Sequence, residues 1–409
     1  MLLASSASES RIRTLASHPR AIVAVIAFSF FIDYFLYGLL VPLVAHLHVG
    51  LELEGQFAAF LYGIYGLSVL LVTPIFGYFG ERIGGRSVML SGVALASCAT
   101  ALYGTASSPS MLVLARFCQG AASAALWTSG LALIAAAYAE KRVEMFGYAF
   151  SGGTLGSVLG PLASGALYHA GGYKLPLLIT GALLAVDAPL VAFLIPAGRT
   201  GRHEVVDFRA LLLSRSIVAP ALTVALAAFS LGIIEPLLPL RLAGHGATSL
   251  TLGVLFTIST VVYGLSAPLV GRVSERISIQ RVIVMGMVAM AVSLPLMAAF
   301  GSIFLIGVTL CLANMSYAFM LNPASAELGN VVDRAGMSCY SAVYAVYNIV
   351  YSIGMLVTTV LASAAVTILN FWGVLLCASA ILLLSIPALS VVARPEKAIP
   401  RSPVDHSPC

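Results

Sequence analysis

Apolar runs long enough to cross a membrane recur along almost the whole chain, separated by short polar breaks. A hydrocarbon core of ~30 Å needs about 20 helical residues at ~1.5 Å per residue. Runs that meet this requirement cover residues 21–45, 56–79, 87–107, 110–138, 144–170, 173–196, 216–241, 250–273, 280–300, 302–325, 337–367 and 370–393. The pattern therefore predicts an all-α integral membrane protein with twelve transmembrane helices.

The polar breaks alternate in charge, which predicts the orientation of the chain in the membrane. Of the 21 lysines and arginines, all but Lys174, Arg241 and Arg116 lie in one alternate set of breaks. Loops rich in lysine and arginine stay on the cytoplasmic side, so both termini are predicted to be cytoplasmic. The longest internal break also contains an amphipathic segment and divides the helices into two groups of six. The predicted organisation is a tail (1–20), a six-helix bundle (21–196), a cytoplasmic linker (197–215), a second six-helix bundle (216–393) and a tail (394–409).

Composition excludes several classes of function. Charged residues make up 9% of the chain, against about 25% in soluble domains, which is too few for nucleic-acid binding. There is no Gly-x-x-x-x-Gly-Lys phosphate loop, no metal-ligand spacing of cysteine and histidine, and no nucleophile–base pair. We therefore expect no enzyme, no ATP as direct energy source, no metal and no cofactor. A channel is also disfavoured, because the sequence contains no repeated filter segment.

An acidic residue near the middle of the first apolar run is the leading functional candidate. Asp33 lies about twelve residues into this run, which places it ~18 Å deep at ~1.5 Å per residue. A carboxylate at that depth costs roughly 2.5–3.5 kcal/mol, and such groups face a bundle interior or a watery cavity. The alternative is a packing role, in which the carboxyl is protonated or paired.

A charged motif occurs once in each half of the chain. The segment from Pro74 to Arg86 is repeated from Pro268 to Ile277, between the second and third predicted helices of each half, with proline, glycine, glutamate and arginine equally spaced. Duplicated six-helix halves are typical of secondary transporters. We expect the two copies to be loops that latch the cytoplasmic side through ion pairs; the alternative is a purely topogenic role for their positive charge. The residues concerned are Gly77, Glu81, Arg82, Gly84, Arg86, Gly271, Glu275 and Arg276.

At this point the sequence resembles the major facilitator superfamily, and within it the twelve-helix drug/proton antiporters. The segment 77–86 is similar to the cytoplasmic signature of that superfamily, with Glu81 where aspartate is usual. Residues 114–120, which include Arg116, resemble a motif of proton-coupled members. A third motif resembles one found in exporters, and its glycines, four residues apart, allow close helix packing; it comprises Gly152, Gly156, Gly160, Pro161 and Gly165.

A closer similarity is to the vesicular amine transporters and their bacterial relatives. Asp33, Asp187 and Glu235 match acidic positions of that group. The chain departs from it at Tyr65, where a lysine is usual, and at Asn348, where an aspartate is usual. These departures weaken the expectation of a monoamine substrate.

The resemblance implies a proton-coupled exporter of a small organic compound, cationic or amphipathic, which works by alternating access. Asp33 is the first candidate for exchanging a proton against substrate, and Glu235 is the second. Glu235 could be a proton site or a gate; the alternative is that it merely lies near interfacial water. Arg116 is expected to couple protonation to helix position or to brace helix ends, and Asp187 to be structural. A polar and aromatic cavity lining is expected from Tyr34, Tyr37, Trp127, Tyr263, Asn314, Tyr344, Tyr347 and Asn348.

Other possibilities stay open at this stage. The cargo could be a metabolite, a siderophore or a metal chelator, and an anionic cargo would move the main role from Asp33 to Arg116. A facilitator is a further alternative. We expect a monomer in a lipid bilayer, in a bacterial inner membrane, whose partners are its small-molecule substrate and protons.

Overall fold

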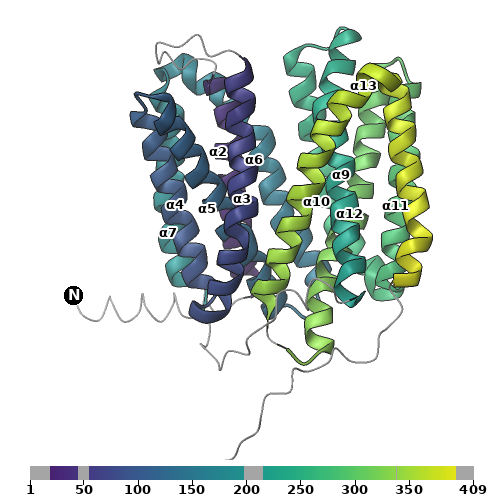
Figure 1. Cartoon of the computed structure of the whole chain (residues 1–409), viewed down its shortest axis with the longest axis horizontal. Coiled ribbons are helices and arrows are strands. Elements are labelled where there is room, and N and C mark those ends of the chain that lie inside the picture. Colours follow the sequence, from purple (N-terminus) through teal and green to yellow (C-terminus); the bar gives the residue numbers. More distant parts are fainter. Residues whose placement is uncertain (1–18, 45–54, 198–214, 338, 393–409) are drawn as a thin grey trace, which may run out of the picture.

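The computed structural model describes residues 19–44, 55–197, 215–337 and 339–392. These residues form eleven long helices (Figure 1): α2 (Pro19–Val44), α3 (Gly55–Ile83), α4 (Gly85–Thr105), α5 (Pro109–Ala137), α6 (Arg142–Gly171), α7 (Lys174–Leu194), α9 (Arg215–Gly244), α10 (Ser249–Arg276), α11 (Ile279–Ala299), α12 (Ile303–Arg334) and α13 (Tyr340–Val392). The predicted tails (1–20 and 394–409) and the predicted linker (197–215) lie almost entirely outside the described residues.

The last helix contains two spans, because its backbone turns at Asn370. This residue has a φ of 54° and a ψ of 177°, a positive-φ conformation that is uncommon for residues other than glycine. Its Oδ1 atom accepts a hydrogen bond from the backbone N–H of Gly373 at 3.1 Å, as an N-cap does at the start of a helix. The described helices thus correspond to the twelve predicted segments, with the eleventh and twelfth joined at this kink; eleven of them are long and apolar enough to cross a membrane, and α6 is the exception.

The helices fall into two groups that lie side by side (Figure 1). Helices α2–α7 pack among themselves, as do α9–α13, and the groups meet where α6 contacts α10 and α12 and where α3 and α5 contact α13. Figure 1 shows the groups converging at its lower end and separating towards its upper end.

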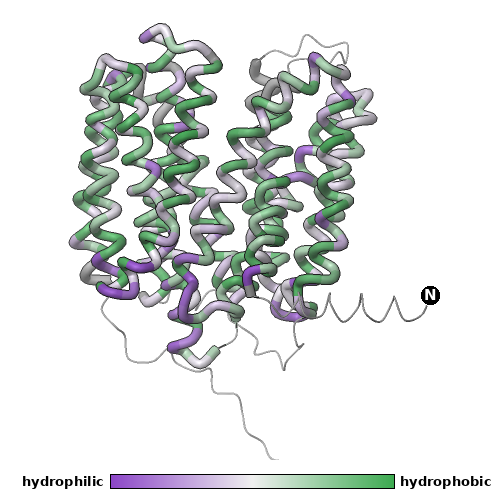
Figure 2. Tube along the Cα trace, turned by 180° about the vertical axis from the view of Figure 1, so that it is seen from behind, coloured by the Kyte–Doolittle hydropathy of each residue, from purple (hydrophilic) through white to green (hydrophobic). Residues whose placement is uncertain are grey.

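Polar residues of the described helices gather at one end of the molecule (Figure 2). We call it the cationic end, because the helix ends there contain Arg20, Arg82, Arg86, Lys141, Arg142, Arg276, Arg281 and Arg334. The opposite end has Lys174 and Arg241. That the cationic end faces the cytoplasm remains a prediction from the positive-inside bias.

Close packing of α6 on α2 fixes the helix that carries Asp33. A Cβ atom at Gly156 would lie 2.2 Å from the carbonyl oxygen of Phe31, so only glycine permits the observed approach. The same holds at Gly152, which faces Ala27, whereas a Cβ atom at Gly165 would meet nothing within 4 Å. The glycine motif therefore allows two helices of one group of six to pack closely.

This packing makes opposite predictions for one substitution at two positions of the same motif. Gly156→Ala should lower thermal stability, because overpacking costs roughly 1–3 kcal/mol. Gly165→Ala should leave stability unchanged or raise it, because removing a helical glycine gains roughly 0.5–1 kcal/mol. Thermal unfolding of the two purified variants in one detergent measures the difference; equal midpoints would contradict the packing described here.

Candidate functional site

The Asp33 carboxyl is buried inside the first group of helices and is held from α5. Its side chain is 2% exposed, and its Oδ2 atom accepts hydrogen bonds from Ser123 Oγ at 2.7 Å and Trp127 Nε1 at 3.0 Å. The Tyr65 hydroxyl donates in turn to Ser123 Oγ at 2.9 Å. Burial favours the neutral form of a carboxyl group, whereas donated hydrogen bonds favour the charged form. The two influences on the charge of the Asp33 carboxyl oppose each other here.

Aromatic rings surround this carboxyl. The Trp127 ring stacks on Phe30 with 3.9 Å between centroids and meets the Tyr34 ring edge-on at 5.2 Å. Tyr37 continues the wall, with its centroid 6.1 Å from that of Tyr34 and 4.9 Å from that of Tyr65. The faces of such rings attract cations, and Tyr34, Tyr37 and Tyr65 are each partly exposed. Three of these aromatic residues, Tyr34, Tyr37 and Trp127, were predicted to line a cavity.

Arg116 lies two turns before Ser123 on α5 and is buried, with 3% of its surface exposed. Its Nη1 atom donates to Gln119 Oε1 at 2.7 Å, and its Nε atom donates to the carbonyl oxygen of Leu61 at 3.3 Å. The guanidinium carbon lies 4.9 Å from the ring centroid of Tyr37 and 5.0 Å from that of Tyr65. Its charge also attracts the Asp33 carboxylate. The structure thus brings two of the predicted coupling residues to one site.

Glu235 reaches the same region from the other group of helices. Its side chain on α9 is exposed, yet it interacts electrostatically with Tyr34 of α2 and Tyr351 of α13. The Tyr351 hydroxyl lies 3.1 Å from that of Tyr317 of α12. Glu235 therefore faces the Asp33 side of the molecule instead of lying alone at the membrane surface.

The remaining predicted lining residues lie in the second group. The Tyr263 hydroxyl donates to Asn322 Oδ1 at 2.9 Å, and Asn348 Nδ2 lies 3.4 Å from Thr128 Oγ1 across the interface between the groups. Tyr347 stacks on Phe150 of α6, with 6.1 Å between centroids.

Two further lining candidates bond to the backbone of the second group. The Tyr344 hydroxyl donates to the carbonyl oxygen of Ser325 at 2.8 Å, and Asn314 donates to Leu310 of its own helix at 3.2 Å. Both side chains are buried. Their hydrogen bonds stabilise the second bundle, whereas Tyr347 and Asn348 contact the first.

Asp187 lies apart from the residues around Asp33. It is fully buried on α7, and Ser29 Oγ lies 2.9 Å from both of its carboxylate oxygens. Ser29 lies one turn before Asp33 on α2, so the two acids bond to different partners. Asp187 therefore provides a second buried acid against which Asp33 can be compared.

The two groups are bonded together at the cationic end. Arg142 of α6 donates to Asp333 Oδ2 at 2.6 Å, to Asn330 Oδ1 at 2.8 Å and to the Tyr340 hydroxyl at 3.2 Å. Its Nε atom donates to the carbonyl oxygen of Ala135 at 2.8 Å. The buried guanidinium thus joins the first group to α12 and α13 of the second.

The repeated motif lies beside this junction, but not as the predicted pair of loops. Glu81 lies in the last turns of α3, and its Oε1 atom accepts from the backbone N–H of Ala342, near the start of α13, at 3.1 Å. A Cβ atom at Gly77 would lie 2.6 Å from the Cβ atom of Ala345, and one at Gly271 would lie 3.0 Å from that of Glu144. Each copy therefore places its glycine against a helix of the opposite group.

The prediction of ion pairs formed by the motif arginines was wrong for the described residues. The ion pairs there are Arg142–Asp333 and Arg334–Glu327, and the Arg82 guanidinium lies instead over the Tyr78 ring at 4.3 Å. The motif residues without an ion pair in the described structure are Arg82, Arg86, Glu275 and Arg276. Only Gly84, with a φ of 84°, separates α3 from α4; the rest of the first copy is helical, as is the second copy up to Arg276.

The comparisons with known proteins agree with this architecture. The sequence profile of the Major Facilitator Superfamily matches residues 24–220 and again residues 220–407. The chain belongs to this superfamily. It is therefore a multi-pass membrane protein, as the sequence resemblance implied.

Individual members give finer comparisons. The synaptic vesicular amine transporter of Rattus norvegicus is 24% identical over 294 residues (70% of this chain, 56% of that protein). The chromaffin granule amine transporter of the same species is 25% identical over 331 residues (78% and 63%). An MFS-type transporter, ppzB, of Metarhizium rileyi is 29% identical over 193 residues (46% and 40%). The chain thus spans less than two thirds of the length of these relatives.

A solved structure of the superfamily shares the fold. The human organic anion transporter MFSD10 (TETRAN) superposes with a TM-score of 0.69 at 17% identity, covering 91% of this chain and 99% of that one. This agreement confirms the predicted superfamily fold.

Three residues that bond across the cationic end were missed by sequence reasoning. Arg142 was counted only as a topogenic charge, and Asp333 lies beyond residue 325, where the apolar run ends. In the structure α12 continues to Arg334. The helical spacing of Asn330 and Asp333 was the available signal, because residues three apart share a helix face.

The junction at the cationic end predicts a conformational effect of one substitution. Asp333→Asn should widen the distance between spin labels at the exposed positions Ser87 and Gln280. A hydrogen bond to a charged group contributes roughly 1.5–3 kcal/mol. Its loss should therefore lower the ratio of molecules closed at the cationic end to molecules open there about ten-fold or more. Arg334→Gln is the matched control, since its ion pair with Glu327 lies within α12. An unchanged distance in Asp333→Asn, or an equal widening in both, would contradict a latch between the groups.

Proposed function

We propose that this transporter exchanges protons for a small organic compound, cationic or amphipathic, and exports it by alternating access. The observation that carries the proposal is the buried Asp33 carboxyl, which is held by Ser123 and Trp127 beside an aromatic wall. No other described acid combines burial with donated hydrogen bonds and a neighbouring set of cation-attracting rings.

The exchange follows from the chemistry of this carboxyl. In its protonated form Asp33 is neutral and tolerates the low-polarity interior. A cationic substrate against the faces of Trp127 and Tyr34 stabilises the carboxylate, so binding of substrate expels the proton. When protons are abundant on the opposite side, protonation removes the attraction and releases the substrate. One group thus binds either partner and releases one when the other arrives.

Arg116 and Glu235 have supporting roles in this proposal. Arg116 and Ser123 lie seven residues apart on α5 and so share a helix face; a change in the charge of Asp33 therefore acts on both through one rigid helix. Glu235, exposed on α9, is a second proton site or a gate on the path between solvent and Asp33.

Alternating access requires the groups to separate at one end while they close at the other. The Arg142–Asp333 contact and the contact of Glu81 with Ala342 support a closed cationic end. With this end in the cytoplasm, as the positive-inside bias predicts, the described conformation is open to the outside. We further propose that the protein is a monomer of the bacterial inner membrane with both termini in the cytoplasm.

The named relatives favour a cationic cargo without identifying it. Two of them are amine transporters, but this chain has Tyr65 and Asn348 where that group has charged residues. Tyr65 donates here to Ser123, in the hydrogen-bond chain of Asp33. The substrate is therefore proposed as a class, not as a monoamine.

Transport in liposomes tests the proposal with two matched variants. With an imposed pH gradient, wild-type protein should accumulate a fluorescent organic cation, and Asp33→Asn should reduce this flux at least ten-fold because the site can no longer alternate between proton and cation. Asp187→Asn removes another buried acid, outside the aromatic wall, and should retain most of the flux.

Gradient-driven flux that survives in Asp33→Asn would refute the role of Asp33. If a panel of anionic metabolites or chelators is instead transported, with loss in Arg116→Gln and not in Asp33→Asn, the cationic cargo would be wrong and the anionic alternative correct.

A further inference from the structure

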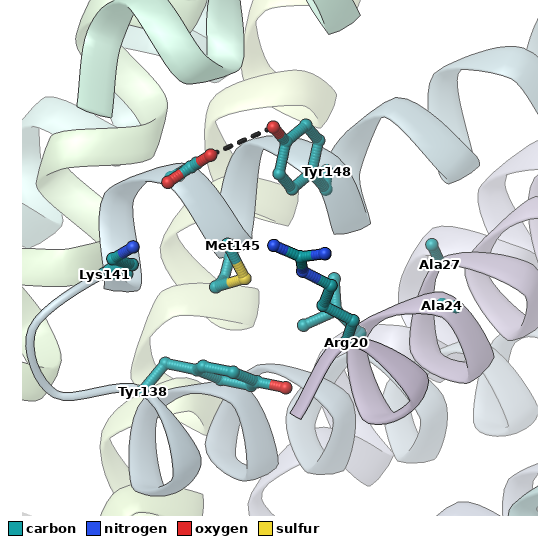
Figure 3. Close-up of a pocket in the computed structure, with 9 residues that line it drawn as sticks. Arg20, Ala24, Ala27, Tyr138, Lys141, Met145 and Tyr148 are labelled. Atoms are coloured by element: carbon teal, nitrogen blue, oxygen red, sulfur yellow. Dashed lines mark hydrogen bonds between the residues drawn. The ribbon is translucent and has the colours of Figure 1, made fainter. Parts of the chain in front are cut away.

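A pocket of ~840 Å³ opens at the cationic end, away from the Asp33 site (Figure 3). One wall is the first two turns of α2, and the other is the junction of α5 with α6. Arg20 lies on the α2 wall and Lys141 on the α6 side, and both side chains are exposed. The mouth of the pocket thus carries two cations contributed by segments far apart in the sequence.

Glu144, the acidic residue that lines this pocket, already has a hydrogen-bond partner. Glu144 accepts a hydrogen bond from the Tyr148 hydroxyl at 3.0 Å, shown as the dashed line in Figure 3. Arg272 of α10 adds a third positive charge close enough to act on Tyr148. The local balance is therefore positive, which favours an anionic ligand.

An unsatisfied hydroxyl also points to a polar ligand. The Tyr138 hydroxyl is buried and has no hydrogen-bond partner among the described residues, although buried polar groups normally have one. Figure 3 shows this hydroxyl directed across the pocket towards the α2 wall, below Arg20. A ligand oxygen between Tyr138 and Arg20 would satisfy it.

The deeper part of the pocket is apolar. Val23, Ala24 and Ala27 follow Arg20 along α2, over roughly 10 Å at ~1.5 Å per residue. Ala24 is exposed, so the apolar part of the pocket is open at this position. A charged mouth above an apolar groove at the end of a transmembrane helix has the dimensions of a lipid headgroup followed by the start of its acyl chains.

We propose that this pocket binds the headgroup of an anionic phospholipid. Arg20, Lys141 and the Tyr138 hydroxyl contact the phosphate, and the acyl chains lie along Val23 to Ala27 of α2. Basic pockets between transmembrane helices on the cytoplasmic side recognise such headgroups, and the positive-inside bias predicts that side for this end. The bound lipid would bridge α2, the helix of Asp33, to α6.

Ligand-dependent thermal stability of the purified full chain tests this proposal. Dioctanoyl-phosphatidylglycerol should raise the melting temperature in a saturable manner, whereas dioctanoyl-phosphatidylcholine and inorganic phosphate at equal concentrations should not. Each of Arg20→Gln and Lys141→Gln should weaken the apparent affinity about five-fold, the factor equivalent to ~1 kcal/mol for one basic side chain at an anionic leaflet. Native mass spectrometry counts the bound lipid independently.

Two further variants separate the pocket from general charge effects. Ala24→Trp fills the groove at an exposed position without changing charge and should abolish the shift; it also keeps the test valid if a charge variant does not fold. Arg281→Gln removes an exposed cation of the same end, outside the pocket, and should leave the affinity unchanged.

The outcomes that overturn the proposal are distinct. Equal shifts with both lipids would indicate an unspecific groove, and a shift with inorganic phosphate alone would indicate a site for a soluble anion. Binding of phosphatidylglycerol that persists in Ala24→Trp would place the lipid elsewhere on the protein, and the absence of any shift in the wild type would refute a lipid site.

Discussion

The structure depends on one constraint: the carboxyl group of Asp33, deep among the helices, must be satisfied by the protein, and in the proposed function it must also exchange its proton. Ser123 and Trp127 meet the first requirement with two hydrogen bonds to Asp33. The close approach of α6 to α2, permitted by glycines such as Gly156, fixes the helix that presents the carboxyl. Arg116 lies on the same helix as both donors, and its charge attracts the Asp33 carboxylate.

The contacts between the two groups of helices are suited to being broken. At the cationic end the polar part of these contacts consists of the buried Arg142 guanidinium with its partners, Asp333 among them, and of the Glu81 carboxylate at the start of α13. Near the motif glycines Gly77 and Gly271 the opposing helices meet without bulky side chains in between. Such a junction costs a few hydrogen bonds to open, and water can replace these, whereas the glycine packing inside the first group has no such substitute. Under the proposed alternating access, this difference favours rocking of the two groups as rigid bodies.

Sequence patterns predicted the features that depend on local periodicity. They did not predict the contacts between residues that lie far apart in the chain. The twelve spans, the buried Asp33 and the close-packing glycines all follow from residue type and helical spacing. The hydrogen-bond donors of Asp33 lie about ninety residues away, and the partner of Arg142 lies about one hundred and ninety residues away, so no local pattern identifies them. The extension of α12 to Asp333 was missed because a helix continues beyond its apolar run where polar contacts stabilise its end.

The most direct test of the central claim is proton release on substrate binding. Wild-type protein in weakly buffered detergent solution with a pH indicator should release about one proton per bound organic cation, because the cation replaces the proton on a single carboxyl group. Asp33→Asn should release none, even at concentrations that force residual binding. Equal proton release from wild type and Asp33→Asn would contradict the account, since another group would then perform the exchange.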